Sequence, residues 1–134
     1  MRPIRLITHH AIAGIKYALP DATKMCGDGR IEQLADAPAS PALRSAYVKF
    51  TDGAYTKWHS HTGEQLLIAT SGKGFVQLRG QPIQELHEGD RVFIPADVWH
   101  RHGAIEGGTF IHLAVTTGET QWDDGDPCRR DSTQ

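Results

Sequence analysis

Residues 53–65 read GAYTKWHSHTGEQ and contain two histidines separated by one residue. On extended backbone, side chains two positions apart point to the same face, so the imidazoles of His59 and His61 can reach one ion. Ser60, between them, points away. This pair is therefore the first candidate for a metal site.

Two further residues complete the pattern. Gln65 follows four positions after His61, and His100 comes directly after the turn-forming run Pro95–Trp99. Three imidazole nitrogens and one amide oxygen would leave positions on a divalent ion open for water or substrate. Taken singly, His100 would be an ordinary structural histidine; the combination predicts a metal site at His59, His61, Gln65 and His100.

The surroundings of this stretch read as strands. From Arg44 onward, apolar residues alternate in short runs between glycine-bearing turns, and no segment keeps a helical spacing. The predicted strands are Arg44–Thr51, Gln65–Thr70, Gly74–Arg79, Ile83–Leu86, Asp90–Ile94 and Thr109–Thr116. Many short antiparallel strands must close or form a sandwich, because open edges recruit other chains. The predicted fold class is therefore all-β, a barrel or jelly roll.

The length of 134 residues suits a single domain with one barrel. We divide it into an irregular lead (1–43) with room for an edge strand, a barrel (44–122) and a polar tail (123–134) that we expect to fray. Ile12–Leu19 could be a strand or a short helix, and the pattern does not decide between them.

Charge and composition argue against nucleic acid and membranes as partners, and the expectation of a small-molecule substrate comes from the metal-site pattern. The formal net charge is -2, with 14 basic and 16 acidic residues, so no basic field would attract nucleic acid or anionic lipid. No apolar run approaches the roughly 18 residues of a membrane span, and we expect a cytoplasmic protein. Cys26 and Cys128 suit free thiols better than a disulfide, although a disulfide linking the two ends remains an alternative. Arg101 is expected on a solvated face.

The metal-site pattern resembles the two motifs of the cupin superfamily. The first motif is similar to Gly53, five residues, His59-x-His61, three residues, Gln65, six residues and Gly72. The second is similar to Gly89, five residues, Pro95, one residue, Asp97, two residues and His100. The resemblance implies the cupin fold, a double-stranded β-helix or jelly-roll barrel.

Two positions depart from the usual cupin motifs. Gln65 stands where a glutamate is usual, and a neutral amide should bind the metal more weakly and leave it more Lewis-acidic. Glu64 would point to the opposite face of the strand. Asp97 replaces a usual glycine.

A narrower resemblance is to the carboxymuconolactone-decarboxylase-like cupins, including bacterial manganese-dependent hydroxynitrile lyases. The residues that carry it are Trp58–His61, Gln65, Gly74–Gln77, Pro82–Ile83, Trp99–Ala104, Thr109–Val115 and Trp122. It implies the same three-His, one-Gln metal set, pocket histidines at His102 and His112, and small pocket residues at Ala46 and Val48. Thr116 stands where those lyases often carry a glutamine.

Proton transfer is assigned to two histidines outside the metal set. His102 would face the same interior as His100 if the strand continues, which suits a general base. His112 lies on a mostly apolar wall and could carry a proton. Each could instead be structural. Trp99 is assigned to the pocket, and the other aromatics, such as Phe93, to the core.

The function expected is a metal-dependent lyase of hydroxynitrile-lyase type, which cleaves a cyanohydrin to an aldehyde and cyanide, or a related lyase or isomerase. A dioxygenase and a non-catalytic ligand-binding or sensing cupin are the alternatives. The resemblance favours Mn²⁺, and the ligand set also suits Fe²⁺, Zn²⁺ or Ni²⁺. A homodimer is expected, with the lead supplying an exchanged edge strand.

Overall fold

A computed structural model describes residues 19–35 and 42–130 of the chain. Apart from Leu19, the segment Ile12–Leu19 lies outside the described residues. A short 3₁₀ helix, Ala22–Lys24, precedes eleven strands within this part of the chain. They are β1 (Met25–Cys26), β2 (Ile31–Ala35), β3 (Arg44–Phe50), β4 (Tyr55–Thr56), β5 (His59–His61), β6 (Gln65–Leu78), β7 (Gln84–His87), β8 (Arg91–Ile94), β9 (His100–Ala104), β10 (Phe110–Thr116) and β11 (Thr120–Trp122).

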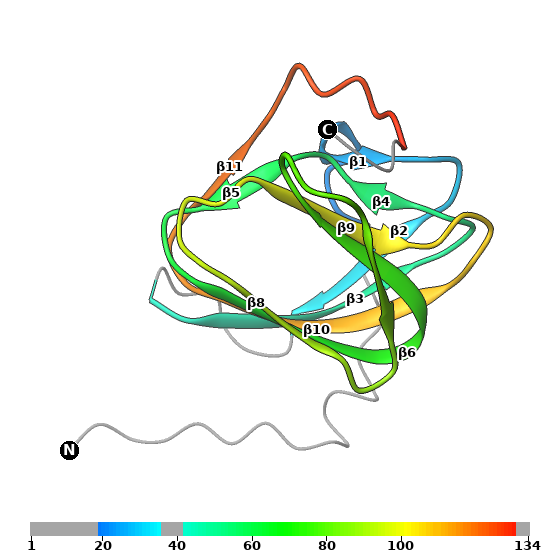
Figure 1. The fold of residues 1–134 in the computed structure, drawn as a ribbon, viewed down its shortest axis with the longest axis horizontal. Coiled ribbons are helices and arrows are strands. Elements are labelled where there is room, and N and C mark those ends of the chain that lie inside the picture. Colours follow the sequence, from blue (N-terminus) through cyan, green and yellow to red (C-terminus); the bar gives the residue numbers. More distant parts are fainter. Residues whose placement is uncertain (1–18, 36–41, 131–134) are drawn as a thin grey trace.

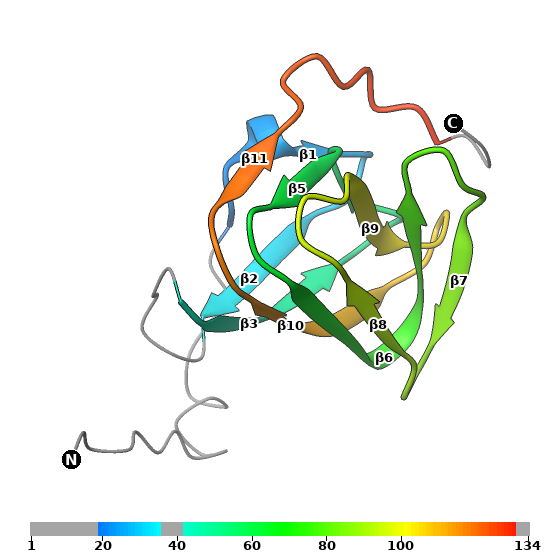
Figure 2. The ribbon, with the colours of Figure 1, turned by 60° about the vertical axis from the view of Figure 1, so that its left-hand side comes forward.

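The strands curl into a barrel, as the sequence predicted (Figures 1 and 2). Along the main path the order is β1-β4-β9-β6-β10-β3-β2, and every pairing is antiparallel. Strand β5 pairs with β9 and β11, while β7 and β8 pair with β6. Strands β1 and β2, both from the lead, pair with β4 and β3 of the same chain.

Strand β6 holds the two sides of the barrel together. Its first half pairs with β8 and β10, and its second half with β7 and β9. The two strands predicted at Gln65–Thr70 and Gly74–Arg79 are therefore one bent strand. The bend falls near Gly72, whose φ of +76° favours glycine, and a Cβ there would lie 2.1 Å from the Thr109 carbonyl oxygen.

Apolar side chains fill the interior between the two sides. The main buried cluster includes Phe50, Leu67, Ile94 and Phe110. Phe93, expected in the core, is instead 59% exposed, because it alternates with the buried Ile94 on β8.

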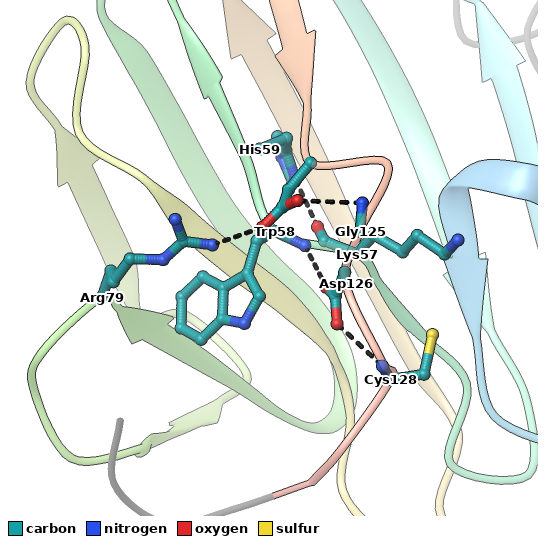
Figure 3. A network of polar contacts seen from close by, with 8 residues as sticks. Lys57, Trp58, His59, Arg79, Gly125, Asp126 and Cys128 are labelled. Atoms are coloured by element: carbon teal, nitrogen blue, oxygen red, sulfur yellow. Dashed lines mark hydrogen bonds and ion pairs between the residues drawn. The ribbon is translucent and has the colours of Figure 1, made fainter.

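The two ends of the described chain are joined by a disulfide between Cys26 and Cys128, so the expectation of free thiols is wrong. The Asp126 carboxylate accepts hydrogen bonds from the backbone N–H groups of Trp58 (2.7 Å) and Cys128 (2.8 Å) (Figure 3). These bonds hold the segment after β11 across the barrel, beside β1 (Figure 1). Residues 123–130 are thus anchored rather than frayed.

Arg101 is also not on a solvated face, because its side chain is fully buried. Its Nε donates to Gln77 Oε1 at 3.0 Å, its Nη1 donates to the Arg129 carbonyl, and its guanidinium lies 4.6 Å from the Trp58 ring centroid. No helix in the described ranges has the length and apolar character needed to span a membrane.

Candidate metal centre and pocket

Strands β5, β6 and β9 bring the predicted metal ligands together. Strand β5 carries His59 and His61, β6 begins at Gln65, and β9 begins at His100, which pairs in register with His59. All four side chains are at least 94% buried. Ring nitrogens of the three histidines lie within 4.8 Å of one another, and Gln65 Oε1 lies 3.1 Å from His100 Nε2.

The outer nitrogen of each histidine is held by an oxygen. His59 Nδ1 contacts the Lys57 carbonyl, His100 Nδ1 contacts the Val98 carbonyl, and His61 Nδ1 contacts Thr120 Oγ1, each at 2.8 Å. A carbonyl can only accept, so His59 and His100 donate from Nδ1, and their Nε2 atoms carry lone pairs. This is the arrangement by which proteins orient metal-binding imidazoles.

The contact between His100 and Gln65 fits a pair of ligands that would share one cation. In the neutral imidazole, His100 Nε2 presents a lone pair to the lone pairs of Gln65 Oε1, so no hydrogen bond forms unless the ring is protonated. Burial opposes that by lowering the pKa of His100 to about 4. His61 Nε2 is likewise buried with no hydrogen-bond partner. A divalent cation between these atoms would satisfy all of them, and ligands bound in cis to one ion lie about 3 Å apart.

Gln65 is oriented by a hydrogen bond to Thr116, which the sequence did not indicate. Its Nε2 donates to Thr116 Oγ1 at 2.9 Å, which turns Oε1 toward the histidines. Glu64 is exposed whereas Gln65 is buried, as expected from strand alternation.

Burial keeps the histidine cluster neutral. Desolvation lowers the pKa of His59 well below its usual value, and it lowers the pKa of His61 to about 4 with help from the nearby charges of His100 and Arg44. Near pH 7 the rings are therefore in the neutral form that binds a metal.

The two histidines assigned to proton transfer form a pair deeper in the barrel. His112 Nε2 lies 3.0 Å from His102 Nδ1, and both side chains are buried. His102 Nε2 has no hydrogen-bond partner. Burial lowers the pKa of His102 well below its usual value and that of His112 to about 4. The sequence indicated each residue separately, but not that they share a hydrogen bond.

A cavity of about 200 Å³ opens onto the cluster. Ala46, Val48 and Thr116 line it, as do His102 and His112. Trp99 does not; its ring lies 5.1 Å from the Arg79 guanidinium. Lining residues that sequence reasoning missed include Met25, Gln33, Arg44, Thr120 and Trp122. The alternation Arg44, Ala46, Val48 on one strand could have indicated Arg44.

The chain is similar in sequence to known proteins. A family model described as a cupin domain matches residues 46–116. The chain is 39% identical over 89 residues to an (R)-mandelonitrile lyase of Granulicella tundricola, covering 66% of this chain and 68% of that protein.

Solved structures show the same fold. A cupin-like protein from Thermotoga maritima is similar with a TM-score of 0.72 at 34% identity, over 82% of this chain and 87% of that one. The DMSP lyase DddQ from Ruegeria pomeroyi gives a TM-score of 0.62 at 21% identity, over 82% and 61% of the two chains. The second likeness concerns the fold alone.

Proposed function

Because this chain belongs to the cupin family, we propose that it is a metal-dependent lyase of hydroxynitrile-lyase type, which cleaves a small cyanohydrin to an aldehyde and cyanide. The observation that carries the proposal is the inward-facing Nε2 and Oε1 atoms of His59, His61, His100 and Gln65 beside a small cavity. The similarity to a mandelonitrile lyase supports this reaction type.

The four side chains would hold a divalent ion, for which we propose Mn²⁺, with Fe²⁺, Zn²⁺ and Ni²⁺ also suited to nitrogen and oxygen donors. Such an ion supplies Lewis-acid polarisation of a substrate oxygen. The protein keeps the donors neutral by burial and fixes their orientation through the Lys57 and Val98 carbonyls and the Thr120 hydroxyl.

The pair His102–His112 would move the proton. When His102 donates from Nδ1 to His112 Nε2, the unpartnered His102 Nε2 carries a lone pair and can accept the hydroxyl proton of the cyanohydrin. The C–C bond then breaks, its electron pair leaves with cyanide, and the same proton yields hydrogen cyanide. The His112 contact would stabilise the charged His102 ring during this step.

Apolar side chains would limit water in the pocket. Ala46, Val48, Ala114 and Trp122 line the cavity beside the histidines. Its volume of about 200 Å³ lies below the range typical of drug-sized ligand pockets, so it suits a small substrate.

The test is release of cyanide and aldehyde from a panel of cyanohydrins by the Mn²⁺-loaded protein, under air and under nitrogen. We expect oxygen-independent turnover, lowered roughly 10²- to 10⁴-fold in His102→Ala or His112→Ala while the metal stays bound. The exposed His87→Ala serves as the matched control. Oxygen-dependent turnover would favour a dioxygenase, and a loaded site without turnover would favour a ligand-binding cupin.

We also propose a homodimer. Strand β2 lies at the edge of the sheet, and sheet edges readily pair with other chains. A monomer at micromolar concentration in light scattering would refute the proposal.

The disulfide weighs against the expected cytoplasmic location, because disulfides persist mainly in oxidising compartments.

A further inference from the structure

The lining of the cavity includes a positively charged residue and no negatively charged one. Among its lining residues, Arg44 is the one with a permanent charge, and no aspartate or glutamate lines it. A divalent ion would therefore add to a positive potential that no lining carboxylate offsets.

The guanidinium of Arg44 lies at the edge of the histidine cluster. Its Nη2 donates to Thr120 Oγ1 at 3.2 Å, and the same oxygen lies 2.8 Å from His61 Nδ1. Its Nη1 donates to the carbonyl of Gly118. One hydroxyl and one imidazole thus separate the guanidinium from the point where the ring nitrogens converge.

Arg44 has no acidic partner in the described part of the chain. None of the ion pairs within residues 19–35 and 42–130 includes it. Its two hydrogen bonds go to neutral oxygens and use two of the five N–H donors of a guanidinium. A partly buried arginine with donors to spare is suited to bidentate binding of a carboxylate.

We propose that Arg44 binds a carboxylate of the substrate, so that the cavity takes a small organic acid whose hydroxyl or carbonyl oxygen faces the histidine cluster. This rests on the proposed function only in using the same cavity as the substrate site. For the lyase reaction, the substrate would be the cyanohydrin of an oxo acid. The pocket would then differ in charge preference from one built for mandelonitrile, which is neutral.

The test measures binding by calorimetry to the Mn²⁺-loaded protein. The probes are three oxo acids, each paired with its neutral amide: glyoxylate, 4-oxobutanoate and 3-formylbenzoate. Each pair has the same shape and differs in charge, so the ratio of the two affinities isolates recognition of the carboxylate. We expect at least one acid to bind at least tenfold more tightly than its amide.

Variants of Arg44 test whether its guanidinium binds the carboxylate. In Arg44→Met the acid preference should fall by at least threefold, and Arg44→Lys should retain more of it than Arg44→Met. Arg91→Met, which removes an exposed arginine on β8, is the matched control and should leave the preference unchanged. If Arg44→Met does not fold, Arg44→Gln removes the charge while keeping an amide donor for the Gly118 carbonyl.

The inference is overturned if no acid reaches the tenfold preference. It is also overturned if the preference survives the loss of Arg44, since the carboxylate would then bind the metal and Arg44 would only brace Gly118 and Thr120. Failure of every cyanohydrin to release cyanide would refute the lyase proposal without touching the acid preference. Cyanide release without an acid preference would overturn this inference alone.

Discussion

Gln65 replaces the glutamate usual at this position of the cupin motif, and its side chain is oriented by Thr116. The amide N–H donates to Thr116 Oγ1, which leaves the amide oxygen facing the histidines. A carboxylate would bring a negative charge to the ion, and the Thr116 hydroxyl could still donate to it. We expect Gln65→Glu to bind Mn²⁺ roughly tenfold more tightly, because hard divalent ions prefer charged oxygen ligands. Weaker binding by calorimetry would show that the amide is needed for orientation.

His112 offers a test of burial through pH. Its pKa is lowered to about 4 by desolvation, against about 6.5 in an unfolded chain. Between these values the unfolded state binds a proton that the folded state does not, so the free energy of unfolding falls as pH falls. The loss approaches about 1.4 kcal/mol per pH unit for one group. Urea unfolding of metal-free His112→Leu between pH 6.5 and 5 should show a shallower decline than the wild type. An identical decline of the free energy of unfolding with pH in the two proteins would contradict the lowered pKa of His112.

The direction of a side chain on a strand follows from the sequence, whereas contacts between distant residues do not. Alternation on extended backbone was enough to group His59 with His61 and to separate Glu64 from Gln65. It could not indicate that Thr116 orients Gln65, because these residues are 51 positions apart and meet only across β6 and β10.

Strand β6 shows why closely packed glycines matter at the scale of elements. Gly74 lies between β7 and β9, paired with Leu86 and Ala104. A Cβ there would lie 2.4 Å from ring atoms of Phe110 and 2.6 Å from the Gly103 carbonyl oxygen. We expect Gly74→Ala to lower the free energy of unfolding by about 1–3 kcal/mol, the usual cost of overpacking.

Gly125→Ala is the control for this substitution, since its nearest neighbour would be Asp123 Oδ1 at 3.5 Å. Equal melting temperatures for the two variants would contradict the packing described for β6.

Four of the six predicted strands appear with no end shifted by more than one residue, because the alternation of apolar residues is strong there. The division of β6 was wrong because Ser71 and Gly72 look like a turn, yet both keep their pairing with β10. The short strands β1 and β11 carry too few residues for a periodic pattern, so only tertiary pairing defines them.

The disulfide constrains the whole molecule, because it joins residues separated by 102 positions. In the chain-entropy model, a loop of this length stabilises the folded state by roughly 3–5 kcal/mol. We expect a reductant to lower the urea midpoint of the wild type accordingly. The double variant Cys26→Ser/Cys128→Ser should have the same urea midpoint as the reduced wild type, and the reductant should not change it. An unchanged wild-type midpoint would contradict the role of the disulfide.

The anchoring of residues 123–130 could not be predicted from the sequence, because it depends on contacts with residues far away in the chain. Asp126, Cys128 and Arg129 look like parts of a polar tail. Their contacts are with Trp58 between β4 and β5, Cys26 on β1 and Arg101 on β9. Only closure of the barrel brings these partners together.

An electron paramagnetic resonance titration with Mn²⁺ would show whether one divalent ion is held by His59, His61, Gln65 and His100. We predict one tight site per chain in the wild type, lost in His61→Ala and retained in His112→Ala, whose ring lies outside the proposed ligand set. No tight site in the wild type, or equal binding by His61→Ala, would contradict the account.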